Sequence, residues 1–222
     1  RFFLKYQFCD ANFITTSPSA VDFVNDDRTF FIPNPIDPSI DVNKNYLSKN
    51  KIDIFIAISH GQHRGVLKDG FKEKRTVFID KLTKKASYNI FGINKNPVWG
   101  QNFFDELSKC SMGINLSRGH PIKYYSSDRL SSLLGNGLLT FIHEKYEYQK
   151  FFTKNEIITF KNISDLNYKI LFYKKFEKLQ KKIASNGYRK AHKIFNNKLI
   201  SNFIVNKTMG YKIKKKYSWM DG

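Results

Sequence analysis

A short stretch of the chain contains three cationic side chains: Arg118, Lys123 and Arg129. Ser126 and Ser127 lie between Lys123 and Arg129, directly before a run of leucines, where a helix N-cap is expected. A helix N-terminus exposes unpaired backbone amides and favours anions such as a diphosphate. The residue types and their spacing therefore predict an anion-binding site at this helix start.

Two further cations, Arg64 and Lys68, belong to the polar loop from Ser59 to Gly70. This loop follows the strand expected over 52–58, so that it too can face a ligand at the end of a sheet. Cations on a protein this basic also serve simply as solvated surface charge, and for Lys68 we weigh the two roles equally.

Groups that could transfer a proton are fewer, and each has an ordinary structural role as well. His120 is a loop histidine within reach of the predicted site. Asp128 falls in the first turn of the predicted helix, where the helix dipole alone stabilises a carboxylate. Glu144 follows the next strand and could meet a substrate hydroxyl. The catalytic residues stay unassigned, with these three as candidates.

Neither the histidines nor the cysteines have the spacing of metal ligands. His60, His63 and His120 are not arranged as in a zinc site, and Cys9 and Cys110 are the only cysteines. We therefore expect no metal, no cofactor and two reduced packing cysteines. Trp99, Tyr124 and Tyr125 could stack on a base or a sugar, with core packing as the competing role.

The cations are positioned by a strand, a loop, a helix and a second strand between Ser111 and His143. Met112, Ile114 and Leu116 alternate as in a strand, and Leu130, Leu133 and Leu134 form one apolar helix face. Gly135-Asn136-Gly137 ends the helix, and the apolar run from 138 to 142 is typical of a parallel strand buried on both faces. Ligands bind to such folds at the carboxyl ends of the strands.

Strand and helix patterns alternate along the rest of the chain with short connections, which predicts an α/β fold. The class expected is a Rossmann-like parallel sheet with helices on both faces. The strands are expected at 52–58, 89–93, 111–116, 138–142 and 157–160. The helices are expected at 71–85, 102–110, 146–152, 164–173, 174–195 and 197–209. In the helix over 71–85, Phe71, Val77, Phe78 and Leu82 are expected to face inward.

Short strand-like runs at 11–16 and 29–32 precede the proline-rich segment IPNPIDPSID, which must be extended. We divide the chain into a remnant of an N-terminal domain with its linker (1–42), a ligand-binding domain (43–196), and a C-terminal helix with a basic tail (197–222). Because the sequence begins with Arg1 in mid-pattern, an upstream part is expected.

The chain of 222 residues has a formal net charge of +19, which favours anionic partners. No helix-turn-helix, zinc-finger or RNP-like pattern supports a nucleic-acid-binding protein, which stays a secondary alternative. No apolar run is long enough to span a membrane. We expect a cytoplasmic location. A surface this basic is also compatible with peripheral contact to an anionic inner membrane face.

One long segment reads NPVWGQNFFDELSKCSMGINLSRGHPIKYYSSDRLSSLLGNGLLTFIHEKYEYQKFF and continues to NEIITFKNISDLNYKILFYKK. This segment resembles the CgeB-like (spore protein YkvP type) glycosyltransferases of group 1, which have the GT-B fold. The resemblance covers about Lys51 to Phe195 and implies a C-terminal donor-binding domain. It implies metal-independent transfer of a sugar from a nucleotide sugar to a cell-envelope glycan, a lipid-linked acceptor or a protein. For such a donor, the candidate binding residues are the cations and serines of the predicted loops and helix start: Arg64, Lys68, Arg118, Lys123, Ser126, Ser127, Arg129 and Ser132.

The chain departs from this group at the carboxylates. Many members carry two glutamates separated by seven residues, and these positions fall on Tyr124 and Ser132. In the R-x-F-E run of CgeB-like relatives, Arg129 fits the first position, while Ser131 and Ser132 replace the Phe and Glu. Donor and stereochemistry are therefore left open. The alternative function is a non-catalytic nucleotide-sugar or glycan-binding module.

Overall fold

A computed structural model describes residues 11–21, 27–49, 52–58, 74–93, 95–117, 120–213 and 217–220. Its centre is a five-stranded sheet in the order β4-β3-β5-β6-β7, in which every pair of neighbours is parallel. The strands are β3 (Ile52–Ala57), β4 (Tyr88–Phe91), β5 (Cys110–Asn115), β6 (Leu139–His143) and β7 (Ile158–Phe160). The predicted α/β class, a parallel sheet with helices on both faces, is confirmed.

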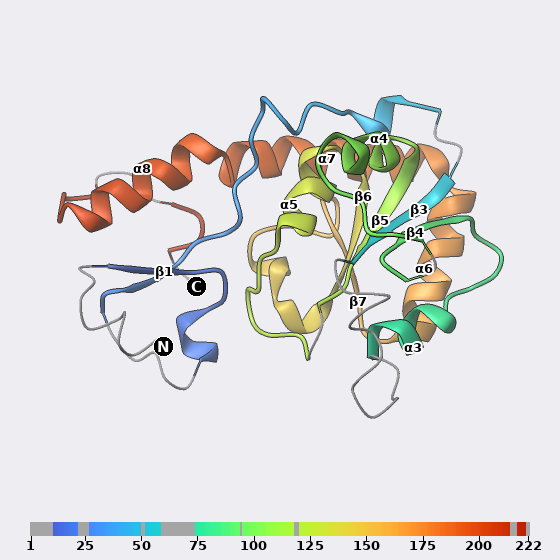
Figure 1. The fold of residues 1–222 in the computed structure, drawn as a ribbon, viewed down its shortest axis with the longest axis horizontal. Helices are drawn as coiled ribbons and strands as arrows, with labels where there is room; N and C mark the ends of the chain where they lie inside the picture. Colours follow the sequence, from blue (N-terminus) through green and yellow to red (C-terminus); the bar gives the residue numbers. More distant parts are fainter. Residues whose placement is uncertain are drawn as a thin grey trace.

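Two layers of helices cover this sheet (Figure 1). The helices are α3 (Lys74–Asp80), α4 (Gly100–Ser108), α5 (Asp128–Gly135), α6 (Ile163–Lys175) and α7 (Glu177–Ile194). Successive residues of a strand point to opposite faces, and the core divides accordingly. Ile54 and Ile56 share a cluster with α3, α6 and the first half of α7, whereas Phe55 clusters with α4 and α5.

Helix α5 lies close against β5 because Gly113 leaves room for it. A Cβ atom at Gly113 would approach the Cδ2 atom of Leu133 to 2.3 Å. Leu133 and Leu134 are buried, as the leucine spacing predicts, and Ser127 caps the helix by accepting a hydrogen bond from the Leu130 amide at 3.3 Å. The sequence and the tertiary contacts therefore agree on where α5 begins and which face it buries.

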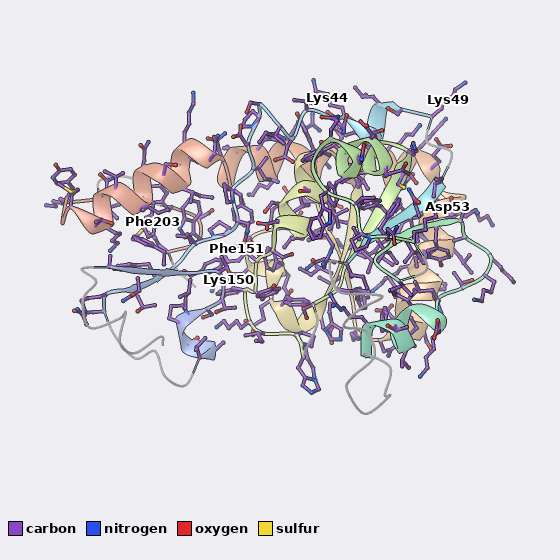
Figure 2. All side chains as sticks on the ribbon, in the orientation of Figure 1. Lys44, Lys49, Asp53, Lys150, Phe151 and Phe203 are labelled. Atoms are coloured by element: carbon purple, nitrogen blue, oxygen red, sulfur yellow. The ribbon has the colours of Figure 1, made fainter. Side chains whose placement is uncertain are left out.

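The N-terminal strands and the C-terminal helix pack against each other. Strand β1 (Asn12–Ile14) pairs in parallel with β2 (Thr29–Phe31), and α8 (Asn197–Thr208) lies beside them. Phe203 points from α8 toward this pair and contacts the rings of Phe13 and Phe30 at 6.3 and 6.0 Å (Figure 2). The division of the chain at 42 and 196 stays a prediction.

The linker is extended, as its prolines require, but it is also part of the core. Ile36 is fully buried and forms a parallel bridge with Asn196. Its amide donates to the carbonyl of Phe195 at 2.8 Å. The linker therefore joins the N-terminal strands to the junction between α7 and α8.

Several predicted helix boundaries were wrong. Helix α3 ends at Asp80, and Val77 points outward with 40% of its surface exposed, whereas Ile79 and Leu82 are buried. The short helix expected over 146–152 is two 3-10 turns, Glu144–Tyr146 and Tyr148–Lys150, because Glu147 between them has a positive φ of 56°.

The C-terminal helices differ from their predicted limits as well. Helix α6 was expected from 164 but begins at Ile163, and Asn162 caps it by accepting a hydrogen bond from the Asp165 amide at 3.0 Å. The helix expected from 174 begins only at Glu177 and then continues through Gly187 without a break. A Cβ atom at Gly187 would lie 2.3 Å from the Glu156 carbonyl oxygen, so this glycine permits a close approach instead of ending the helix.

Candidate functional site

The strand order reverses at β3, where the chain first adds β4 on one side and then β5 on the other. The chain therefore continues from β3 and from β5 toward opposite sides of the sheet, and parallel α/β proteins bind ligands at such a reversal of strand order. The described residues at this carboxyl edge line a larger cleft of about 370 Å³ and a smaller cleft of about 220 Å³.

One wall of the larger cleft is polar and comes from the start of α5. It consists of Ser127, Asp128, Arg129 and Ser132. These side chains reach the cleft because the leucines of α5 occupy its other face. Asp128 accepts a hydrogen bond from the side-chain amide of Asn34, so the linker also contacts this wall.

Arg129 joins the ends of two strands at the crevice. Its Nε donates to the carbonyl oxygen of Ala57, the last residue of β3, and its Nη1 donates to that of Leu116, directly after β5, at 2.6 Å. Burial, and secondarily the positive charge of Arg75, lowers the pKa of Arg129 to about 10. The guanidinium is thus still charged at neutral pH and is fixed in place by both strands.

The opposite wall is apolar and aromatic. It includes Trp99, Phe103 and Phe104, and the rings of Phe103 and Phe104 meet edge to face at 5.4 Å. Trp99 directly precedes α4 and leaves 66% of its surface exposed. An exposed indole beside a hollow offers a flat surface on which an aromatic ligand can stack.

The smaller cleft lies beyond Asn115 and is lined by polar groups from four elements, among them Arg75, Asn115, His143 and Tyr146. The Asn115 side-chain oxygen contacts the Ser127 hydroxyl at 3.1 Å, so Asn115 links the two clefts. Its buried amide nitrogen has no hydrogen-bond partner among the residues that the structure describes. Burial lowers the pKa of His143 and raises that of Tyr146, whose hydroxyl bonds to Ser117.

Arg75 and Asn115 line the smaller cleft but were not predicted as site residues from the sequence. Arg75 is only 6% exposed, yet it occurs in the run Lys-Glu-Lys-Arg, where a cation looks like surface charge. Asn115 could have been recognised from the sequence pattern, because it is a polar residue at the end of an otherwise apolar buried strand.

The structure gathers only some of the predicted site residues. Ser127, Asp128, Arg129 and Ser132 line the larger cleft together with Trp99 and Tyr125. Arg64, Lys68, Arg118, His60 and His63 lie outside the described residues.

The other candidates have different surroundings. Lys123 forms an ion pair of 3.8 Å with Glu147 and lies over the Tyr124 ring at 5.0 Å. Ser126 is buried and accepts from the Asn34 amide at 2.8 Å, and Tyr124 is 2% exposed in the core. Neither His120 nor Glu144 is among the described residues that line the two clefts. Arg129 is therefore separated from Lys123, with which the sequence had grouped it.

Within the described ranges, no three histidine, cysteine, aspartate or glutamate side chains come together as a metal site would require. The expectation of a metal-independent protein without a cofactor stays a prediction.

Two solved structures have a fold similar to that of this chain. Sucrose-phosphate synthase from Thermosynechococcus elongatus is 9% identical, with a TM-score of 0.55, over 87% of this chain and 56% of that chain. TarM is 14% identical, with a TM-score of 0.59, over 94% of this chain and 46% of that chain. At these identities the likeness shows the fold alone, which is that of GT-B proteins. The chain spans about half the length of each.

No curated protein matches this chain. A family model described as glycosyl transferase-like matches residues 74–203, which include α5, Arg129, both walls of the larger cleft and the helices that follow. Since this match covers more than half of the chain, the protein belongs to the glycosyl transferase-like family.

Proposed function

We propose that this chain is the donor-binding part of a glycosyltransferase and that its larger cleft binds the nucleoside diphosphate of a nucleotide sugar. The observation that carries the proposal is Arg129, a charged guanidinium fixed to the ends of β3 and β5 beside the N-terminus of α5. Family membership and the position of the cleft at the strand-order reversal support it.

Transfer of a sugar leaves negative charge on the departing diphosphate, and an enzyme speeds the reaction by stabilising that charge with fixed donors. A guanidinium has five N–H groups, and the two carbonyl bonds of Arg129 occupy two of them. The remaining donors can bind phosphate oxygens. Ser127 and Ser132 add hydroxyls on the same wall, and Trp99 provides a surface for the base.

The finer assignments are also proposals. The protein is of the CgeB-like type, acts without a metal, and transfers to a cell-envelope glycan, a lipid-linked sugar or a protein. It works at the cytoplasmic side of the membrane, with an upstream acceptor domain completing the cleft. In its donor site, the Ser132 hydroxyl stands where many relatives have a ribose-binding glutamate.

Calorimetric titration with UDP, GDP and ADP tests the donor site. One nucleotide should bind with a defined stoichiometry, and its sugar derivatives should compete with it. If none of these nucleotides binds while the protein is folded, the proposal fails.

One observation favours a non-catalytic binding module as the second candidate. Of the two positions where relatives carry glutamates, Ser132 offers only a hydroxyl and Tyr124 is buried in the core. Incubation of a longer chain that contains the upstream part with the preferred nucleotide sugar distinguishes the two. Hydrolysis or transfer of the sugar indicates an enzyme, and tight binding without turnover indicates a module.

A further inference from the structure

A row of four apolar side chains lies at the corner between α6 and α7, three of them exposed and one, Phe172, half-buried. Tyr168, Phe172 and Phe176 follow one another at intervals of four residues, with ring centroids 6.3 and 4.7 Å apart, and Leu179 comes three residues later. Tyr168 is 67% exposed, Phe176 45% and Leu179 39%. We call these four residues the aromatic stripe.

The aromatic stripe lies within a strongly basic segment. From Tyr168 to Lys182 the chain has six lysines and one glutamate, a net charge of +5. Three of the lysines form ion pairs of 2.7 to 2.8 Å with carboxylates: Lys169, Lys174 and Lys181. The other three are exposed: Lys175, Lys178 and Lys182. Lys175 lies 5.7 Å from the centre of the Phe176 ring, so cation and aromatic surface are presented together.

This corner is at the opposite edge of the sheet from the two clefts. Helix α6 starts after β7 at the carboxyl edge and runs back, so that its last turn reaches the amino edge. There Lys174 pairs with Asp53 near the start of β3, which Figure 2 labels at this edge. A partner on the aromatic stripe would therefore leave the larger cleft accessible.

We propose that the aromatic stripe and its exposed lysines dock the protein on an anionic lipid bilayer. Aromatic side chains favour the interface between water and lipid, and an exposed helical face with lysines around it can lie in that plane. Each lysine close to an anionic leaflet strengthens binding about fivefold. Lys175, Lys178 and Lys182 supply this attraction at the stripe, and the net charge of +19 of the whole chain adds a longer-range one.

Charge alone would suit any polyanion, including nucleic acid. The exposed aromatic stripe favours a bilayer, because a lipid interface accepts rings and an aliphatic side chain in one plane without a matching groove. Docking of this kind does not depend on nucleotide binding, so the two proposals can fail separately.

Sedimentation of the 222-residue chain with lipid vesicles tests the docking surface. The vesicles are pure phosphatidylcholine in one series and contain phosphatidylglycerol in the other, each at low and high salt. Binding should need phosphatidylglycerol and should weaken with salt, because salt screens the lysine charges.

Two sets of variants separate the apolar from the charged contribution. The double variant Tyr168→Ser with Leu179→Ser should bind anionic vesicles at least tenfold more weakly. Its control, Val205→Ser with Met209→Ser, changes two comparably exposed side chains on and just after α8 and should bind like the parent.

The triple variant Lys175→Gln, Lys178→Gln and Lys182→Gln should also bind anionic vesicles at least tenfold more weakly than the parent. Its control removes three exposed lysines elsewhere: Lys150, Lys154 and Lys193. All the changed residues are exposed, and circular dichroism verifies that each variant is folded.

The proposal is overturned if the chain does not sediment with anionic vesicles. It is also overturned if the serine variant binds anionic vesicles as tightly as the parent does, or if each control variant loses as much vesicle affinity as its test variant. Retention of vesicle binding by the serine variant, with tight salt-dependent binding to an oligonucleotide, would indicate a nucleic-acid surface instead. Nucleotide titration of the same variants should be unchanged, whichever way the vesicle result falls.

Discussion

Replacement of Arg129 by methionine removes the fixed cation while keeping a long apolar stem. Two effects on folding stability oppose each other. The loss of two hydrogen bonds from a charged donor costs about 3 to 6 kcal/mol. Against this, burial and secondarily repulsion from Arg75 lower the Arg129 pKa from 12.5 to about 10, which corresponds to about 3 kcal/mol of unfavourable free energy that the variant no longer carries. The net loss of stability should be about 0 to 3 kcal/mol, so the variant should fold.

The effect on nucleotide binding should be larger than the effect on folding. A hydrogen bond from a charged group is worth about 1.5 to 3 kcal/mol, so losing one phosphate contact should weaken binding about 10- to 150-fold. Calorimetry with the preferred nucleoside diphosphate measures this loss, and urea denaturation measures the stability. The matched control is Lys123→Met, which removes a cation that pairs with Glu147 outside the larger cleft and should leave affinity within about twofold.

Arg129→Lys completes the test, because lysine keeps the charge but cannot bridge the Ala57 and Leu116 carbonyls with one planar fork. Its affinity should fall between those of the parent and the methionine variant. If Arg129→Met is folded and binds the nucleotide as tightly as the parent, Arg129 is a structural bridge between β3 and β5 and nothing more.

Three further predictions follow from single contacts. Trp99→Ala should weaken nucleotide binding by about 1 to 3 kcal/mol through lost stacking, with stability unchanged because the side chain is exposed; equal affinity of the variant would rule out stacking there. Gly113→Ala should lower the free energy of unfolding in urea by about 1 to 3 kcal/mol, because its Cβ would overlap Leu133, and adding Leu133→Ala should make the two losses less than additive; strict additivity would contradict this. Burial opposes the ionised form of Asp53, but hydrogen bonds from Lys174 and Ser87 outweigh burial and lower the Asp53 pKa below 3.8. The ionised Asp53 therefore stabilises the folded protein above pH 3.8, and this stabilisation disappears as the pH falls through the folded-state pKa. Lys174→Ala should remove part of this pH dependence, which amounts to at most about 1 kcal/mol of unfolding free energy for a pair this exposed. An unfolding free energy that follows the same curve as the parent's from about pH 2 to 6 would refute this prediction.

The sequence by itself determined the parts of the fold that depend on local pattern. The leucine spacing and the serines before it located α5 and its buried face, and the short apolar runs located the strands of the parallel sheet. These features were predictable because side-chain periodicity follows backbone geometry, which is set by neighbours in the chain. Helix limits were less predictable: the helix expected from 174 begins only at Glu177.

Only the tertiary structure decided which cations come close to one another at the carboxyl edge of the sheet. Lys123 is six residues from Arg129 in the sequence, yet it pairs with Glu147, whereas Arg75 comes close to Arg129 from a different helix. Arg129 itself has its place because β3 and β5, more than fifty residues apart in the chain, lie side by side and present two carbonyls to it. Strand order and loop paths arise from packing across the whole domain, and no local periodicity encodes them.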